Sequence, residues 1–305
     1  MQRVKTVFFF MIVILFSTNF SVAQTGNAGA TGLAFLKLGV GARAGGMGGA
    51  FSAISDDATA TFWNPAGLTY SRAQVAFTHT EWLQDITNEF LAITFPAFRG
   101  TLGLSFYTNS VGGIERRLNP SEEPIGTVEA NDVALGLSYA TSISSSLKAG
   151  LTVKYLYEKI FIESAAGYAF DFGLILQPFS NPLQLAVVAQ NFGSMDKLRA
   201  ESINLPKTVR LGVSYLFALD GIGGKVLLAA DGVKVIETDF RGSFGAELQF
   251  KSQLAVRVGY QTGLSRQAFG GGLGLKMNRY HLDYGFIPFD SNFGDTHRFS
   301  FALDL

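Results

Sequence analysis

From about residue 74 to its last residue, the chain alternates between apolar side chains and small or polar ones. The alternation is strictest over residues 133–140, 209–217 and 299–305. Successive side chains of a β-strand point to opposite faces, so each run places its apolar side chains on one face. The other face carries charge, at Lys154, Glu158, Arg210, Glu247, Arg257, Lys276, Asp283 and Asp304. Strands with one face fit for lipid and one for a polar lumen are typical of an outer-membrane β-barrel.

A soluble β-protein would also alternate, and composition separates the two classes. The polar face of a soluble sheet meets bulk water and carries dense charge, whereas only 16% of this chain is charged and 48% is hydrophobic. The non-apolar positions are mostly Gly, Ala, Ser and Thr, and the chain contains 35 glycines. This composition favours a crowded barrel interior and predicts an all-β, transmembrane antiparallel barrel.

The N-terminus carries the features of an export signal. A basic start at Arg3 and Lys5 precedes an apolar run over residues 7–16, and Ser21-Val22-Ala23 gives a cleavage pattern. We therefore predict a signal peptide over residues 1–23 and an outer-membrane location. The apolar run has about half the length of a spanning helix, so any crossing must be made by strands. The chain has no cysteine, which excludes a lipoprotein anchor and a disulfide framework.

Residues 24–73 are rich in Gly and Ala and do not follow the alternation, whereas residues 74–305 do. The second region predicts a barrel of about 14 strands, an even number that lets an antiparallel sheet close without edges. The expected strands are 74–82, 87–97, 100–108, 130–141, 146–158, 165–177, 182–192, 205–217, 223–235, 240–250, 253–261, 266–277, 279–288 and 295–305.

Two longer charged connections are the candidate contact surfaces. The stretch 109–130 is expected to be a loop and a candidate partner-binding site through Arg116, Arg117, Glu122 and Glu123. The second expected loop spans about 193–204. Loops presented by a rigid scaffold often carry function. The alternative, that these loops are solvated connections and nothing more, stays open for each of them.

Several motifs that suggest chemistry are weak. Gly39-x-Gly41-x-x-Ala44 matches a dinucleotide fingerprint, but the Gly-rich run that follows is a poor helix and no strand–helix–strand pattern comes after it. The three histidines are far apart, and no nucleophile has a paired base. The lumen charges have both signs, so mutual pairing explains them best. We predict no enzymatic activity, no cofactor, no metal and, at zero net charge, no nucleic-acid partner.

The segment 46–68 carries a family resemblance. Asp56-Asp57-Ala58, a spacer, and Asn64-Pro65-Ala66-Gly67-Leu68 resemble the N-terminal segment of the FadL superfamily of outer-membrane transporters. That resemblance implies a fourteen-stranded barrel with residues 24–73 as a hatch inside the lumen. The run 36–50 is similar to the PorV/PorQ branch, which belongs to type IX secretion. The residues implied to have a structural or gating role are Gly45, Gly46, Met47, Gly48, Gly49, Asp56, Asp57, Asn64, Pro65, Ala66 and Gly67.

The resemblance implies two classes of function. PorV-like proteins carry secreted cargo, recognised through a C-terminal signal domain, to the cell-surface attachment complex, and PorQ-like proteins hold a partner of that complex. Either role makes the barrel a non-enzymatic platform or shuttle in the lipid bilayer. The alternative is a FadL-like passive transporter of hydrophobic small molecules. The short chain favours the first class; shuttle, anchor and orphan paralogue stay open, as do the cargo, the oligomeric state and a lateral gate.

Overall fold

The computed structural model describes residues 31–83, 86–120, 123–178, 182–219, 223–236, 238, 240–263, 269–289 and 294–305. The predicted signal peptide, residues 1–23, and the first residues of the expected hatch lie outside these ranges. No helix in the described part of the chain is long and apolar enough to span a membrane.

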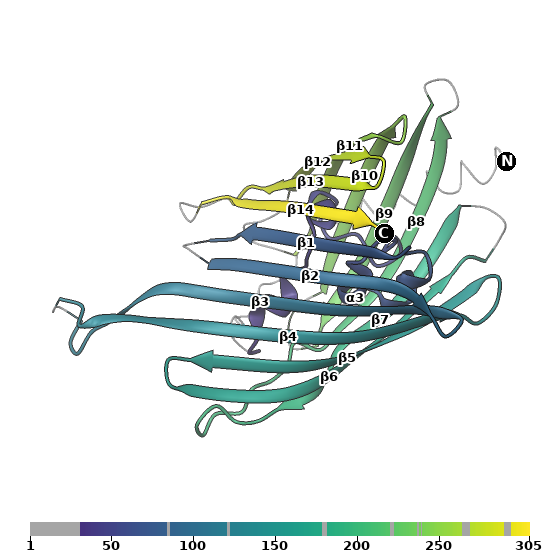
Figure 1. Ribbon diagram of the computed structural model, residues 1–305. Coiled ribbons are helices and arrows are strands. Elements are labelled where there is room, and N and C mark those ends of the chain that lie inside the picture. The colour runs from purple at the N-terminus through teal and green to yellow at the C-terminus, as the bar shows by residue number, and fades with distance from the viewer. Residues whose placement is uncertain are drawn as a thin grey trace.

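The described residues form one closed antiparallel barrel of 14 strands (Figure 1). Each strand pairs with its neighbours in sequence, and β1 pairs with β14, so that Gln74 lies opposite Asp304. The strands are β1 (Gln74–Glu81), β2 (Ile86–Ala97), β3 (Gly100–Arg116), β4 (Gly126–Ser142), β5 (Leu147–Ile160), β6 (Glu163–Leu176), β7 (Leu183–Met195), β8 (Thr208–Leu219), β9 (Gly224–Val235), β10 (Phe240–Phe250), β11 (Leu254–Gln261), β12 (Phe269–Met277), β13 (Tyr280–Ile287) and β14 (Thr296–Asp304).

The barrel predicted from the alternation is confirmed, because every expected strand overlaps an observed one. The two faces of β6 show why the alternation is reliable. Phe170, Phe172 and Leu174 are 42%, 54% and 44% exposed on the outside, whereas the intervening Asp171 and the inward Ile175 are fully buried. Exposed rings and aliphatic chains on the outer face suit lipid, and the closed ladder leaves no strand edge unpaired.

The expected loop at 109–130 is the main correction. β3 runs to Arg116 and β4 starts at Gly126, so most of that stretch is a paired hairpin of two 17-residue strands. A membrane crossing needs only about 9–11 residues, so the hairpin projects beyond its neighbours (Figure 1). A strand that extends beyond the bilayer has no lipid to face and needs no apolar alternation, which explains why the sequence of the projecting part resembles a loop. We call residues 112–129 the arm.

The two ends of the barrel differ. Most of the short connections, such as the two-residue turn Phe98–Arg99 between β2 and β3, lie at the end that holds Gln74 and Leu305. Both turn residues have positive φ angles, as a tight hairpin requires. The arm and the β7–β8 connection lie at the opposite end. Short turns face the periplasm in outer-membrane barrels, so we name the two ends the periplasmic end and the outer end.

Residues 31–73, which we call the inner segment, precede β1 and form four short helices. The helices are η1 (Ala34–Lys37), α2 (Ala42–Gly46), α3 (Ala60–Trp63) and η2 (Pro65–Thr69). They contact inward-facing residues of strands on opposite sides of the barrel: α2 packs against β11–β14, and η2 against β3–β6. Phe51 and Met47 of this segment are fully buried in the main apolar core, and the fully buried Leu68 packs with Ala60 and Ala140 in a smaller cluster.

Candidate functional site

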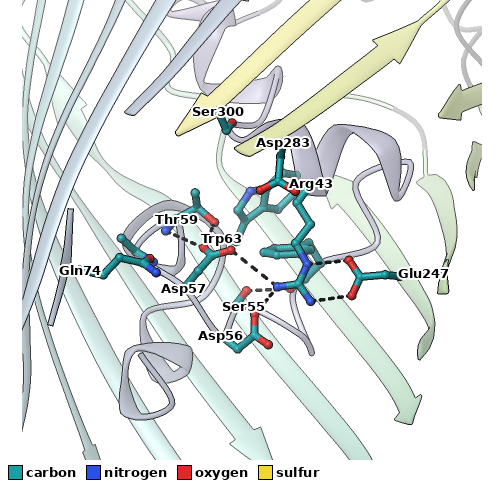
Figure 2. Close-up of polar contacts among 12 residues, drawn as sticks. Arg43, Ser55, Asp56, Asp57, Thr59, Trp63, Gln74, Glu247, Asp283 and Ser300 are labelled. Carbon is teal, nitrogen blue, oxygen red and sulfur yellow. Dashed lines mark hydrogen bonds and ion pairs between the residues drawn. The ribbon is translucent and has the colours of Figure 1, made fainter. Parts of the chain in front are cut away.

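Arg43 of α2 is the centre of an ion-pair network between the inner segment and the barrel wall (Figure 2). Its Nε and Nη2 donate to the two carboxylate oxygens of Glu247 on β10, at 2.8 and 3.0 Å. Its Nη1 donates to Asp56, which follows in the inner segment. Glu247 is 2% exposed and also accepts from Arg257 on β11. The bidentate geometry makes this contact strong and directional.

The network continues along the wall through further pairs of opposite charge. Arg257 Nη1 donates to Asp283 on β13 at 2.6 Å. Further towards the periplasmic end, Asp304 accepts from Gln74 Nε2 at 2.8 Å and lies 3.0 Å from His281 Nε2. Mutual pairing of the lumen charges, expected from their mixed signs, is therefore observed for these groups. Because each buried charge has a partner, the network can hold the inner segment in place.

The network fixes the charge states within the inner segment. Burial by itself would lower the pKa of Arg43, but Asp56 and Glu247 outweigh it and raise that pKa above its ordinary value. Burial, and then the neighbouring Asp56, raise the pKa of Asp57, although Arg43 and a hydrogen bond from Thr59 oppose the increase. Arg43 therefore stays charged over the whole physiological pH range.

Three pairs of glycines on neighbouring strands form the surfaces on which the inner segment lies. Each pair is directly opposite in the sheet register: Gly150 and Gly173, Gly245 and Gly259, and Gly272 and Gly285. A Cβ at Gly150 would lie 2.3 Å from the carbonyl carbon of Pro65, and one at Gly259 would lie 2.0 Å from Gly48 N. Only glycine permits such approach of two backbones. We call these pairs the glycine seats.

The run Gly45-Gly46-Met47-Gly48-Gly49 ends helix α2 and turns the chain. Gly49 N donates to Ala44 O at 2.9 Å and Gly48 N to Gly45 O at 3.0 Å, the pattern of a Schellman cap. Gly48 and Gly49 have φ angles of 63° and 73°, which glycine adopts without strain. A short helix therefore does exist here, but residues 34–37 before it form a 3-10 helix instead of the strand that a dinucleotide site requires.

Asn64 and Pro65 start η2 and join it to the wall. Asn64 is fully buried; its Oδ1 accepts from Ala66 N at 3.1 Å and its Nδ2 donates to Ser52 O at 2.8 Å. Its backbone is extended. Pro65 occupies the first helical position, where no amide donor is required. The motif thus fixes the fold of the inner segment against β5 and β6.

Replacement of Asn64 by leucine is expected to lower the free energy of unfolding by about 1–3 kcal/mol. The side chain keeps a similar volume, but Ser52 O and Ala66 N lose their partners inside the protein. Urea titration of the folded barrel in lipid vesicles measures the change. An unchanged midpoint would contradict the structural role assigned to Asn64.

Two cavities lie on either side of the inner segment. The periplasmic cavity has a volume of about 330 Å³ and is lined by Arg43, Asp57 and residues of the β10–β11 turn. The outer cavity has a volume of about 340 Å³ and is lined by Trp63, Trp82 and residues at the outer ends of the strands. Ala44 lines both. Helix α2 therefore stands between the two cavities.

The candidate residues of the arm are only partly brought together. The Arg116 guanidinium lies over the ring of Phe161 in the β5–β6 turn, 5.4 Å from its centroid. Arg117 Nη2 pairs with Glu115 at 2.6 Å. Glu123 lies exposed in the turn between β3 and β4, and Glu122 is outside the described residues. Sequence reasoning missed Arg43, although a lone cation among the small residues of 38–50 was a usable signal.

The comparisons with known proteins agree on a barrel of the outer membrane. The family model described as type IX secretion system protein PorV matches residues 21–177. No curated protein sequence matches the chain significantly.

Within the described residues, no three His, Cys, Asp or Glu side chains form a group that could hold a metal ion.

Solved structures show the same fold. The monoaromatic hydrocarbon channel CymD is 13% identical with a TM-score of 0.63, over 88% of this chain and 98% of that one. The toluene transporter TodX of Pseudomonas putida is 11% identical with a TM-score of 0.61, over 87% and 96%. A FadL homologue of Pseudomonas aeruginosa is 10% identical with a TM-score of 0.53, over 87% and 98%. At such identities the likeness concerns the fold alone.

Proposed function

Since this chain belongs to the PorV family of type IX secretion system proteins, we propose that it is a non-enzymatic platform or shuttle for secreted cargo in the outer membrane. Its partners would be secreted proteins with a C-terminal signal domain, proteins of the cell-surface attachment complex, or both. The barrel would lie in the lipid bilayer of the outer membrane. The inner segment, with residues 24–30 before it, would act as the hatch of the barrel.

The observation that carries this proposal is the arm. It projects beyond the barrel at the outer end, where a partner can reach it (Figure 1). Leu118 at its tip and Ile162 in the adjacent turn are 71% and 72% exposed, and Ile125 is 51% exposed. Apolar side chains outside the lipid zone, beside the charges of Arg116 and Arg117, are typical of protein-binding surfaces.

The position of the inner segment also supports a platform over a conduit. The inner segment lies between the two cavities, and the ladder between β2 and β3 is continuous from Ile86 to Ala97. A passive transporter of hydrophobic molecules is the second candidate, favoured by the fold shared with CymD and TodX. Its route would have to pass the buried Arg43–Glu247 contact, which suits a hydrophobic solute poorly.

Shortening the arm is expected to remove partner binding while the barrel still folds. Val111 and Ala130 are register partners, so residues 112–129 can be replaced by a two-residue Asn-Gly turn. Affinity purification of the tagged protein from native outer membrane, followed by mass spectrometry, should recover signal-domain proteins or attachment-complex proteins with the full chain. We expect their yield to fall at least about tenfold for the shortened arm, since a few residues supply most of the binding energy.

The matched control is Arg279→Gln, an exposed change in the β12–β13 turn at the periplasmic end. It should leave the recovery unchanged. Purification of a clean barrel that carries only lipid or a hydrophobic molecule would contradict the platform proposal and favour the transporter. Equal recovery of partner proteins with and without the arm would show that the arm is not the docking surface and would point to another outer loop.

A further inference from the structure

The outward face of the barrel carries an apolar groove over β1 to β6, which we call the wall groove. It has a volume of about 740 Å³, and none of the described residues that line it is charged. Leu104, Leu137 and Tyr168 of the lining are 47%, 53% and 60% exposed, so the wall groove opens to the surroundings of the barrel. It is therefore distinct from the two cavities beside the inner segment.

Small residues between two rows of large ones form the wall groove. Ala92, Ser105 and Gly136 are register neighbours on β2, β3 and β4, and all three line it. The positions on either side of them hold large apolar side chains, at Leu91, Ile93, Leu104, Phe106, Leu135 and Leu137. The rings of Tyr155 and Tyr168, 5.6 Å apart, line its β5–β6 end. A flexible hydrocarbon chain fits between such rows, where van der Waals packing would hold it.

The wall groove lies at the depth of the periplasmic leaflet of the membrane. Ile93 and Leu104 are four positions from the periplasmic ends of β2 and β3, at Ala97 and Gly100. Four residues of strand rise about 13 Å, and one leaflet of hydrocarbon is about 15 Å thick. Phe98 in the turn between these strands is 82% exposed, which suits an aromatic ring at the membrane boundary. An acyl chain of the periplasmic leaflet can therefore reach the wall groove.

The periplasmic ends of the same strands are basic. Arg72 precedes β1, Arg99 lies in the β2–β3 turn, and both are exposed. Among the described residues, neither guanidinium has an acidic partner. Asp304 on the neighbouring β14 is already in contact with His281. No Asp or Glu occurs in the sequence of these periplasmic ends, which are residues 69–76, 92–103, 139–152 and 172–186.

The outer ends of these strands have the opposite character. They hold several acidic residues, among them Glu115, Glu129, Asp132, Glu158 and Glu163. An anionic lipid headgroup is attracted by basic residues and repelled by acidic ones. The charges therefore favour a headgroup at the periplasmic end of the wall groove over one at its outer end.

We propose that the wall groove binds one anionic phospholipid of the periplasmic leaflet, with an acyl chain between the two rows and the phosphate at Arg99 and Arg72. A planar guanidinium donates two parallel hydrogen bonds to phosphate oxygens, which makes arginine suited to this headgroup. The site goes beyond the platform role and lies at the opposite end of the barrel from the arm. Its failure would leave the proposed secretion role untouched.

The lipid that stays bound to the purified barrel tests the proposal. The protein is extracted in a neutral detergent with equal amounts of phosphatidylglycerol and phosphatidylcholine of the same acyl chains, and native mass spectrometry identifies the lipid retained. The parent should retain one phospholipid and prefer phosphatidylglycerol at least about tenfold, as two basic residues near the headgroup imply. The double variant Arg72→Gln, Arg99→Asn should retain both lipids equally. Asparagine tolerates the φ angle of 62° at position 99.

Leu137→Trp tests the chain-binding part of the site. The larger side chain fills the wall groove but stays apolar on the outward face, so retention of both lipids should fall several-fold. Its control is Leu211→Trp on β8, which is 58% exposed and outside the wall groove. The control for the arginines is Lys225→Gln, Lys251→Gln, which removes two exposed charges at the same end of the barrel. Both controls should retain lipid as the parent does.

Arg99→Asn alone, in an exposed turn, replaces the double variant if the latter does not fold. Equal retention of the two lipids by the parent would overturn the proposal, as would a parent-like preference in the arginine variant. Unchanged retention in Leu137→Trp would overturn it as well, because the acyl chain would then lie elsewhere.

Discussion

Replacement of Arg43 by methionine is expected to lower the free energy of unfolding by about 3–5 kcal/mol. The change leaves Glu247, which is 2% exposed, with only one of its two guanidinium partners. It also removes the contact with Asp56, which ties the network to the rest of the inner segment. The expected loss of stability comes from the buried charge that is left without its partner. It does not come from a cavity, because methionine keeps most of the apolar volume of the arginine side chain.

The same variant is expected to open the lumen. Helix α2 stands between the two cavities and loses its charged contacts to β10. In planar bilayers the parent protein should show little steady ion conductance, and the Arg43→Met variant should show frequent open events. The matched control is Arg117→Met on the arm, whose surface pair with Glu115 contributes about 0–1 kcal/mol. A variant with the stability and conductance of the parent would contradict the role assigned to Arg43.

Alanine at Gly150 and Gly173 together is expected to displace the Asn64–Pro65 motif. The added Cβ atoms would lie 2.3 Å from the Pro65 carbonyl carbon and 2.0 Å from Asn64 Oδ1, distances that force the inner segment to move. Overpacking of this kind costs about 1–3 kcal/mol for each site. We therefore expect the double variant to fold into a barrel whose inner segment is no longer packed against β5 and β6.

Cysteine labelling can detect this displacement, because the chain contains no natural cysteine. A single cysteine in place of Ala66, which is fully buried, should resist a maleimide reagent in the parent and react at least about tenfold faster in the glycine variant. Gly112→Ala is the control, since a Cβ there meets no atom within 4 Å. Equal protection of the cysteine in all three proteins would refute the seating of the inner segment on the glycine pairs.

The strands could be predicted because their signal is local. The alternation of apolar and polar residues is contained within the nine or so residues of each strand. For β10 (Phe240–Phe250) the expected bounds agree with the observed ones. The projecting half of β3 was missed, because the apolar alternation that marks a strand arises only where one face of the strand meets lipid. Beyond the bilayer, the arm has no reason to keep an apolar face, and its pairing between Glu115 and Thr127 leaves no pattern in the sequence.

The contacts of the inner segment could not be predicted from the chain alone. Arg43 and Glu247 are separated by 204 positions, and their meeting depends on the register of all the intervening strands. The Gly-rich run and the Asn64-Pro65 pair can be singled out in the sequence, yet their glycine partners on β5, β6, β10 and β11 look like ordinary small residues. Glycines at facing register positions are visible only once the pairing is known.

The measurement that tests the platform account most directly is secretion by cells that lack this protein. Cells complemented with the full chain, with the shortened arm or with Arg279→Gln can be compared for the amount of signal-domain cargo on the surface and in the periplasm. The account predicts that cargo accumulates in the periplasm without the protein, and that only the full chain and Arg279→Gln restore its export. Normal cargo export in the absence of the protein, together with reduced uptake of a hydrophobic compound such as toluene, would contradict it.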